Sequence, residues 1–343
     1  MTYERCLIGL HPLKQKEKAA GRCVKESQAL FGKDSDIYQL PFTRSDFVRT
    51  QPAKQKGMSI SGVQPKLSLR MSDQGQLEVT PTSGEYILKP SPEQFPGLAE
   101  NEHAIMCCMK ELDFDIPGFG LIPFAGEDGQ ERAELAFIIE RYDRHGSVKV
   151  HQEQLDGAMS VNDKYGLNAV GQPAISYEQA ARFLVTNVDG SLQSKREIFK
   201  RVVCAYMLGN NDFHLRNIGI IHPENGPLLL APVYDFVSVV PYHESFGSTL
   251  ALPLLAREEC DQSLADGLDS GIGEYIGYDF LEFARGIGLN ENLAKKELDK
   301  LLLAQEKIFG IINDSYMSDE HKEKVTQYIN RRMMLLDMTD KPL

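Results

Sequence analysis

Short alternating runs of apolar and polar residues dominate the chain between about residues 66 and 140. Leu67, Leu69 and Met71 are separated by Ser68 and Arg70, and this period of two is typical of a half-buried β-strand. Apolar residues spaced three and four positions apart over residues 97–112 instead predict a helix. We therefore expect a small sheet with one helix, the strands lying at residues 67–71, 76–80, 85–89, 119–124 and 135–140.

The helical period takes over after about residue 145. Apolar residues from Leu298 to Ile312 follow the i, i+3, i+4 rule and predict one buried helical face. Serines stand where helices should begin, and glycine stands where one should end. The expected elements are a helix at 176–185 capped by Ser176, a helix at 192–208 ending at Gly209, a hairpin with strands at 218–221 and 228–230, and a last helix at 319–336 capped by Ser318.

These patterns divide the chain into three parts and predict the α+β fold class. Residues 1–57 have weak periodicity and several turn signals, residues 58–143 form a small β-rich lobe, and residues 144–343 form a larger helical lobe. Ligand sites often lie between domains, so we expect a nucleotide to bind in a cleft between the two lobes.

Charge is distributed unevenly along the 343 residues. The whole chain carries a net charge of −12, whereas residues 1–57 hold 11 Lys and Arg against 6 Asp and Glu. The negative total argues against non-specific nucleic-acid binding, and no direct nucleic-acid partner is expected. The basic segment could face an acidic partner, although a solvated surface is the simpler interpretation.

Two absences bear on where the protein works. The chain has no run of about 18 apolar residues that could span a membrane. Residues 1–22 lack an apolar stretch long enough for a signal peptide. We therefore expect a cytoplasmic protein, while export by a route that reads no N-terminal signal stays open.

Six cysteines occur without a single CxxC pair, which favours reduced thiols over a disulfide framework. Cys6, His11 and Cys23 could supply three zinc ligands, but a structural zinc site has four. Ordinary thiols are therefore the favoured interpretation. His103 is expected on a helix surface and His222 in a turn, neither as a ligand.

The segment from Gly209 to Asn217 carries the strongest chemical signal. Asp212 and Asn217 are separated by four residues, the spacing of the Asp and Asn in a kinase catalytic loop. Asp235, which follows the predicted hairpin, stands where the metal-binding Asp of a kinase DFG element would fall. Asp212 would orient the attacking hydroxyl, while Asn217 and Asp235 would hold Mg²⁺ through oxygen ligands. Turn residues are the alternative, but both fragments in the expected order favour the kinase.

A lysine and two glutamates fit the same chemistry. Lys89 closes the third predicted strand, where a kinase keeps its phosphate-binding lysine. Glu100 and Glu102 follow on the predicted helix, and we expect Glu102 to pair with Lys89. The loop at 59–66 precedes the first strand but has only one glycine of a phosphate-covering loop, Gly62.

Taken together, these segments resemble the HipA family of bacterial toxin kinases, whose fold is protein-kinase-like and two-lobed, with a small β-rich N-lobe and a larger helical C-lobe. The resemblance runs from about residue 57 to the C-terminus. The segments that carry it are Ser-Ile-Ser-Gly-Val-Gln-Pro-Lys (59–66), Tyr-Ile-Leu-Lys-Pro (86–90), Glu-Asn-Glu-His (100–103), Ile-Glu-Arg-Tyr-Asp-Arg (139–144), Asn-Asp-Phe-His-Leu-Arg-Asn (211–217) and Tyr-Asp-Phe (234–236).

The resemblance implies an ATP- and Mg²⁺-dependent serine/threonine kinase with a defined set of contacts. It implies Asp212 as the catalytic acid/base, Asn217 and Asp235 as metal ligands, and a polar Gln152-Glu153 motif to which no chemical role is assigned. The implied nucleotide contacts are Ser61, Gly62, Val63, Gln64 and Lys66 over the phosphates, Lys89 on them, and Glu140, Arg141 and Tyr142 in the adenine hinge. Asn217 and Tyr234 are further candidate contacts, while His214 and Arg216, inside the loop, could contact phosphate or have a structural role.

Only 58 residues precede Ser59, too few for the N-terminal subdomain of the larger HipA toxins. The chain thereby resembles the short HipT kinases of three-gene toxin–antitoxin systems. That form implies autophosphorylation at Ser59 and Ser61, a small antitoxin resembling the missing subdomain, and a helix-turn-helix DNA-binding protein. It also implies an aminoacyl-tRNA synthetase, of the tryptophanyl type, as the protein substrate.

Two other classes of function remain open from the residues alone. A small-molecule kinase of the aminoglycoside type shares the Asp, Asn and Asp chemistry, although the loop at 59–66 argues against it. A degenerate kinase fold that only binds a partner is the second alternative. Lys89, Asp212, Asn217 and Asp235 are all present, which argues against that alternative.

Overall fold

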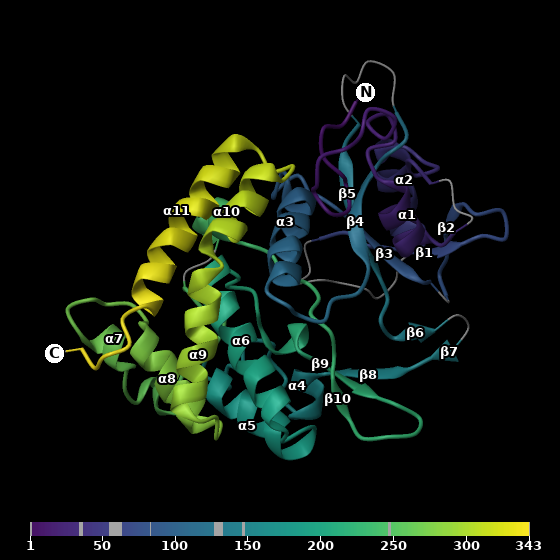
Figure 1. The fold of residues 1–343 in the computed structure, drawn as a ribbon. Helices are drawn as coiled ribbons and strands as arrows, with labels where there is room; N and C mark the ends of the chain where they lie inside the picture. Colours follow the sequence, from purple (N-terminus) through teal and green to yellow (C-terminus); the bar gives the residue numbers. More distant parts are fainter. Residues whose placement is uncertain are drawn as a thin grey trace. The chain divides into compact units, whose positions relative to one another are not determined.

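The computed structural model describes residues 2–33, 37–54, 64–82, 84–126, 133–145, 148–245 and 248–342. Ser59, Ser61, Gly62 and Val63, which were predicted to be phosphorylated or to contact phosphate, lie outside these ranges. The chain divides into two compact units (Figure 1). Unit 1 comprises residues 1–107, 116–149 and 311–318, and unit 2 comprises 108–115, 150–310 and 319–343.

Unit 1 is built on a five-stranded antiparallel sheet in the order β2-β1-β3-β5-β4. Side chains along each strand point alternately to the two faces of the sheet, as the sequence pattern requires. Leu69 of β1 is paired with Val79 of β2 and with Tyr86 of β3. The predicted strands are therefore confirmed to within one or two residues at their ends. They are β1 (Leu67–Met71), β2 (Leu77–Val79), β3 (Tyr86–Pro90), β4 (Phe119–Pro123) and β5 (Leu135–Glu140).

Helices cover both faces of this sheet. Leu88 of β3 and Ile138 of β5 belong to a buried cluster that also takes in Leu30, Phe31 and Phe47, from α1 (Val24–Phe31) and α2 (Arg44–Lys54). The alternate positions of β3 and β5 face the other way, toward α3 (Leu98–Glu111), as the ion pair described below shows. Residues 97–112 were predicted to be helical, and α3 confirms this.

The first 57 residues contain two helices, which the sequence pattern did not predict. Their loops also cover the outer edge of β4. The Leu121 N–H donates to the Leu7 carbonyl at 2.7 Å, and the Leu40 N–H donates to the Pro123 carbonyl at 2.8 Å. An open strand edge is a template for pairing with other chains, so this segment closes the sheet as well as covering one face.

Unit 2 is mainly helical and carries a small three-stranded sheet in the order β10-β9-β8. The hairpin of β9 (Gly219–His222) and β10 (Leu229–Leu230) was predicted, but its neighbour β8 (His151–Gln154) was not. The other α-helices are α4 (Leu155–Ala158), α5 (Tyr177–Asn187), α6 (Leu192–Leu208), α7 (Asp266–Asp269), α8 (Gly277–Gly286), α9 (Glu291–Leu303), α10 (Gln305–Asp314) and α11 (Asp319–Leu336). The short 3₁₀ helices are η1 (Leu215–Asn217), η2 (Val240–Ser245) and η3 (Ala256–Asp261). The remaining strands, β6 (Arg144–His145) and β7 (Val148–Lys149), pair with each other in unit 1.

Several helix ends follow the predicted caps. The Ser176 hydroxyl accepts the Gln179 N–H at 3.1 Å, and Gly209 ends α6 in a left-handed conformation with φ of 74°. The apolar face from Leu298 to Ile312 does not belong to one helix, because the chain turns at Ala304 between α9 and α10. Among the described residues, no helix is both long enough and apolar enough to cross a bilayer.

Candidate active site

Lys89 and Glu102 form a buried ion pair inside unit 1. The Lys89 Nζ lies 2.5 Å from the Glu102 Oε1, and the two side chains are 4% and 0% exposed. Lys89 is on β3 and Glu102 is on the second turn of α3, so a strand and a helix of the same unit position the two groups. Glu100, the alternative partner, instead accepts a hydrogen bond from the Ser91 hydroxyl at 3.4 Å. The structure thus brings Lys89 to the glutamate that the sequence favoured.

The loop that carries Asp212 begins at the end of α6. Gly209 has a left-handed φ of 74°, and a Cβ there would lie 2.5 Å from Val240, so glycine is required at this turn. The Val239 N–H then donates to the Gly209 carbonyl at 2.9 Å. Farther along, the Tyr177 hydroxyl donates to the Phe213 carbonyl at 2.6 Å. The backbone on both sides of Asp212 is therefore fixed by buried groups of unit 2.

Three side chains surround the Asp212 carboxylate. The Tyr165 hydroxyl donates to Oδ1 at 2.9 Å, while the Lys164 Nζ lies 3.8 Å away and the His214 Nε2 lies 3.6 Å away from the same oxygen. Burial lowers the pKa of His214, against the opposing effect of the Asp212 and Asp235 carboxylates. A neutral imidazole is therefore favoured beside Asp212, whose charge is balanced by Lys164 and by the tyrosine hydrogen bond.

The Asn217 side chain is hydrogen-bonded to the backbone of Asp212. Its amide Nδ2 donates to the Asp212 backbone carbonyl at 2.8 Å, which leaves the amide oxygen as the atom that can bind a metal. Asp235 has a φ of 56°, a left-handed conformation that is uncommon outside glycine and often found at functional sites. The rings of Phe213 and Phe236 lie 5.3 Å apart and pack the two loops together.

Mg²⁺ fits this donor set. Hard cations take oxygen ligands, and Asp235 offers a carboxylate while Asn217 offers an amide oxygen. His214, near the Asp212 carboxylate, carries two buried ring nitrogens without a hydrogen-bond partner among the described residues, so a further polar group can bind there. Both loops belong to unit 2, so this fit depends on one unit alone.

The predicted nucleotide contacts of unit 1 lie on and beside the sheet. The buried Gln64 donates to the Pro90 carbonyl at 3.5 Å, next to Lys89, and Lys66 directly precedes β1. At the end of β5, the Glu140 carboxylate accepts the Gly118 N–H at 3.0 Å. Two further residues follow Glu140 in the predicted hinge: Arg141, whose guanidinium makes two hydrogen bonds to Asp143 at 2.9 and 2.8 Å, and Tyr142.

Arg216 and Tyr234 make contacts of a different kind from those predicted. The Arg216 Nε lies 2.6 Å from the Asp156 Oδ2, and the Tyr234 hydroxyl donates to the Arg216 carbonyl at 3.0 Å. These contacts connect Arg216, in the loop at 209–217, to α4 and to Tyr234. That Arg216 and Tyr234 also touch a nucleotide stays a prediction.

The Gln152-Glu153 motif has a structural place. Both residues are on β8, paired with Ile221 and Ile220 of β9, and the Glu153 carboxylate lies 3.3 Å from the His222 Nε2. The motif thus extends the hairpin that follows the catalytic loop. His222 stands in β9 rather than in a turn, which corrects the sequence interpretation. His103 is also corrected, because its side chain is buried in unit 1 and its Nε2 lies 2.8 Å from the Ile8 carbonyl.

Lys164 and Tyr165 are the residues at this site that sequence reasoning missed. They stand 47 and more positions before Asp212 and carry no motif of their own. The contact arises because the Leu215 N–H donates to the Lys164 carbonyl at 3.0 Å, which holds this segment against the catalytic loop. A pairing through backbone atoms leaves no residue pattern, so no sequence signal could have found it.

Comparison with known proteins places the chain. A family model described as HipA-like C-terminal domain matches residues 58–308. A Haemophilus influenzae protein named "Putative kinase" is 48% identical over 341 residues, which cover 98% of each chain.

Two solved structures share the fold. HipA of Shewanella oneidensis MR-1, solved with HipB and its operator DNA, aligns with a TM-score of 0.64 at 20% identity over 87% of this chain and 72% of that chain. The Helicobacter pylori proinflammatory kinase CtkA aligns with a TM-score of 0.51 at 15% identity over 84% of this chain and 93% of that chain. The predicted α+β, kinase-like fold is thereby confirmed, and the chain belongs to the family of proteins with a HipA-like C-terminal domain.

Proposed function

We propose that the protein is an ATP-dependent serine/threonine protein kinase that acts as a bacterial toxin. The observation that carries the proposal is the link between the three predicted catalytic residues in unit 2. The Asn217 amide donates to the Asp212 backbone carbonyl, and the rings of Phe213 and Phe236, which adjoin Asp212 and Asp235, lie 5.3 Å apart. Membership of the HipA-like family and the name of the Haemophilus influenzae relative support the kinase assignment.

Asp212 accepts the proton of the acceptor hydroxyl as its oxygen attacks the γ-phosphorus of ATP. The bond to the ADP oxygen breaks, and the products are ADP and a phosphorylated serine or threonine. Mg²⁺, held by Asn217 and Asp235, supplies positive charge to the phosphate oxygens when it is bound. Lys164, 3.8 Å from Asp212, is placed to neutralise charge on the transferred group.

Lys89, in unit 1, is assigned a role in ATP binding in this proposal. Its ammonium binds the ATP phosphates, and Glu102 fixes its position, as the corresponding ion pair does in protein kinases. The segment from Ser61 to Lys66 covers the phosphates, and Glu140 to Tyr142 hold the adenine. Gln64, the buried member of the covering segment, already contacts the carbonyl next to Lys89.

The regulation and partners follow from the family. We propose that the enzyme phosphorylates its own Ser59, Ser61 or both, which places negative charge beside the phosphate site and switches the toxin off. HipA of Shewanella oneidensis was solved with HipB and operator DNA, which supports a helix-turn-helix antitoxin as a partner here. A second, small antitoxin that resembles the N-terminal subdomain of the larger HipA toxins, and an aminoacyl-tRNA synthetase as substrate, complete the proposal.

Phosphate transfer from labelled ATP, in the presence of Mg²⁺, tests the function. The protein should label its own loop and one major protein in a bacterial extract, which mass spectrometry then identifies. Asp212→Asn should abolish both signals, whereas Asp299→Asn, at an exposed carboxylate on α9, should change neither. Transfer to aminoglycosides but not to proteins would support the small-molecule kinase instead. No ATP turnover by the wild type would support the non-catalytic alternative.

A further inference from the structure

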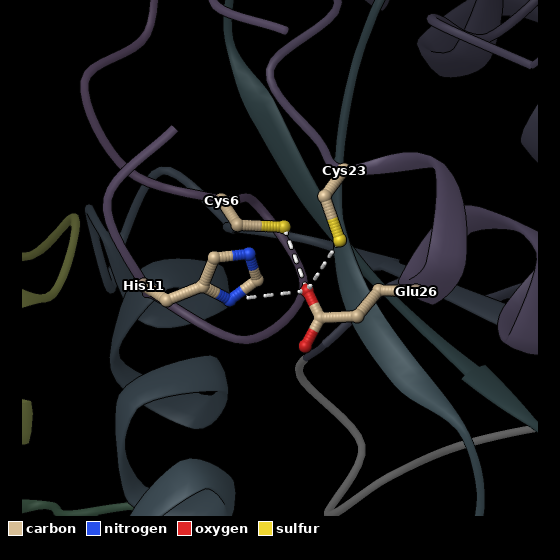
Figure 2. A group of neighbouring side chains, drawn as sticks. All are labelled: Cys6, His11, Cys23 and Glu26. Atoms are coloured by element: carbon tan, nitrogen blue, oxygen red, sulfur yellow. Dashed lines mark hydrogen bonds and ion pairs between the residues drawn. The ribbon is translucent and has the colours of Figure 1, made fainter. Parts of the chain in front are cut away.

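Four side chains with metal-binding atoms converge in unit 1, far along the chain from the catalytic residues. Cys6 and His11 come from the first loop, while Cys23 and Glu26 come from the start of α1 (Figure 2). One ligand atom of each lies within 4.8 Å of all the others. This is the only such group among the described residues, and it supplies the fourth ligand that the sequence did not reveal.

The three separations from the Glu26 carboxylate can be compared with those of a tetrahedral zinc site, and every other pair of ligand atoms lies within 4.8 Å. Glu26 Oε2 lies 2.9 Å from Cys6 Sγ, 3.8 Å from Cys23 Sγ and 3.5 Å from His11 Nδ1. Bond lengths of about 2.0–2.3 Å from zinc to nitrogen, oxygen and sulfur put neighbouring tetrahedral ligands about 3.3–3.8 Å apart. Two of the three distances are therefore in this range, and the third needs a shift of only tenths of an ångström.

The local backbone is shaped to bring the ligands together. The Cys6 N–H donates to the His11 carbonyl at 2.9 Å, and Leu10 between them has a φ of 61° that closes the loop. Gly9 lies directly against the Glu26 carboxylate, and a Cβ there would be 2.1 Å from Glu26 Oε1. Any other residue at position 9 would push the carboxylate out of the group.

The orientation of Glu26 is the second observation that points to a ligand. Glu26 is the third residue of α1, after the N-cap Cys23, where a glutamate commonly turns back to cap the helix backbone. Its carboxylate instead points toward two thiols and an imidazole. The Ile8 N–H also lies 3.5 Å from the Cys6 sulfur, an outer hydrogen bond of the kind that supports metal ligands.

We propose that Cys6, His11, Cys23 and Glu26 bind one zinc ion. Two thiolates and an imidazole suit zinc over magnesium or calcium, and four protein ligands with no open position are typical of a structural site. The ion would displace the thiol protons, because the thiolate is the form that binds metal.

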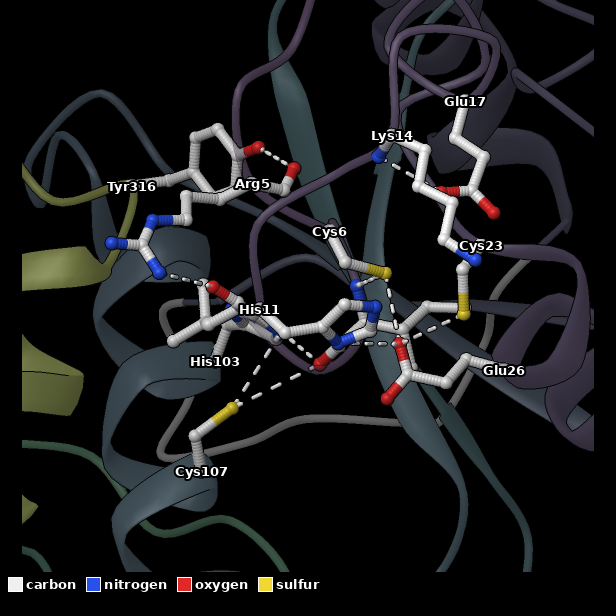
Figure 3. Close-up of polar contacts among 12 residues, drawn as sticks. Arg5, Cys6, His11, Lys14, Glu17, Cys23, Glu26, His103, Cys107 and Tyr316 are labelled. Atoms are coloured by element: carbon white, nitrogen blue, oxygen red, sulfur yellow. Dashed lines mark hydrogen bonds and ion pairs between the residues drawn. The ribbon is translucent and has the colours of Figure 1, made fainter.

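The site would hold the N-terminal loop against the rest of unit 1. The Leu7 carbonyl, next to Cys6, accepts the Leu121 N–H of β4, and the Ile8 carbonyl lies 2.8 Å from the His103 Nε2 of α3. Figure 3 shows His103 and Cys107 of α3 beside Cys6 and His11 of the loop. His103 directly follows Glu102, the partner of Lys89. A metal that fixes residues 6–11 would therefore also steady the part of α3 that positions the buried lysine. This inference does not depend on the proposed kinase activity.

Metal analysis of the untagged wild-type protein is the direct test and needs no variant. We expect about one zinc per chain and, after removal of zinc, Co²⁺ binding with thiolate-to-cobalt absorption and a tetrahedral visible spectrum. Zinc should raise the melting temperature of the metal-free protein. Substoichiometric zinc together with no thiolate–cobalt absorption would overturn the proposal. A Cys6–Cys23 disulfide in protein freshly purified under reducing conditions would also overturn it.

Variants identify the ligands. Cys23→Ser and Glu26→Gln should weaken zinc binding by more than about 100-fold, since even outer partners of metal ligands are worth 10–100-fold. Both residues are partly exposed, so the variants are expected to fold. Cys107→Ser is the matched control, because Cys107 is a buried thiol beside Ile8 that lies outside the group. Cobalt absorption unchanged in Cys23→Ser would rule out this ligand set.

Discussion

The two groups of predicted site residues, one in unit 1 and one in unit 2, are positioned in opposite ways. Lys89 and Glu102 stand on a strand and a helix, are almost fully buried, and contact each other at 2.5 Å. Asp212 stands on the loop that begins at the left-handed Gly209, and its carboxylate lies near a tyrosine, a lysine and a histidine. One part is positioned by packing of regular elements, the other by hydrogen bonds to an irregular backbone.

This difference predicts where each part is vulnerable. A buried charge that loses its partner destabilises the fold, because its desolvation is no longer compensated. A partly exposed carboxylate on a hydrogen-bonded loop can lose its charge with little effect on folding. Substitutions in unit 1 should therefore lower stability and activity together, whereas substitutions around Asp212 should lower activity alone.

Asp212→Asn should have the largest effect on activity and separate the two properties most cleanly. Loss of the group that orients the acceptor hydroxyl typically lowers the rate by about 10²–10⁴-fold. Phosphotransfer should fall by that factor while the denaturation midpoint and Mg-ATP binding, measured by thermal shift, stay close to the wild type. A variant that transfers phosphate at a near-normal rate would remove Asp212 from the mechanism.

Glu102→Gln should lower the free energy of unfolding by about 3–5 kcal/mol, because it removes the carboxylate charge that compensates the buried Lys89 ammonium at 2.5 Å. The double variant Lys89→Met/Glu102→Leu should recover most of this loss, since apolar residues of similar size often replace a buried pair without cost. Urea denaturation measures both. The double variant should nevertheless remain inactive, and recovery of activity with stability would contradict the phosphate-binding role of Lys89.

Tyr165→Phe removes the hydroxyl that donates to the Asp212 carboxylate at 2.9 Å. Without this hydrogen bond the carboxylate is less well oriented toward the acceptor hydroxyl, so phosphotransfer should fall by roughly 10–100-fold. Water can replace the hydroxyl at this partly exposed carboxylate, so stability should stay nearly unchanged. Tyr278→Phe, on α8, serves as the control for loss of a tyrosine hydroxyl in the same unit. Equal rates for the two variants would show that Tyr165 does not position Asp212.

Glu100→Gln should have the smallest effect, visible only in the pH dependence of stability. Burial raises the pKa of Glu100 from 4.5 to about 7. The unfolded chain therefore releases this proton first, and stability falls as pH rises from about 4.5 to 7. Glutamine removes that loss, so the variant should match the wild type at pH 4.5 and exceed it by about 1–3 kcal/mol above pH 7. A constant difference across this range would assign the effect to lost hydrogen bonds.

The regular elements were predictable because their residues carry the period of the element. In the strands of unit 1, apolar and polar residues alternate. The helix α5 begins after Ser176, and α6 ends at Gly209, as their sequences indicate. The helices α1 and α2 were missed for local reasons. Pro52 lies inside α2, which is a helix-breaking signal, and α1 begins after Cys23, which is a poor N-cap.

The candidate site was predictable where its residues form a motif and unpredictable where they do not. Asp212, Asn217 and Asp235 are separated by spacings that phosphoryl transfer imposes, so they could be read from the chain. Lys164 reaches Asp212 through a backbone contact, and Glu26 reaches Cys6 through a glycine that leaves room for it. These contacts depend on three-dimensional proximity, which the order of residues does not record.

The segment Ile311–Ser318 belongs to unit 1 although the residues on both sides of it belong to unit 2. There the Asp314 carboxylate lies 2.5 Å from the Arg5 guanidinium, and the Tyr316 hydroxyl donates to the Arg5 carbonyl, contacts that join residues more than 300 positions apart. A ribosome makes the N-terminal residues first. Unit 1 therefore cannot be completed until nearly all of these 343 residues have been synthesised. The loop that carries Asp212, in unit 2, is made before the unit that carries Lys89 is finished.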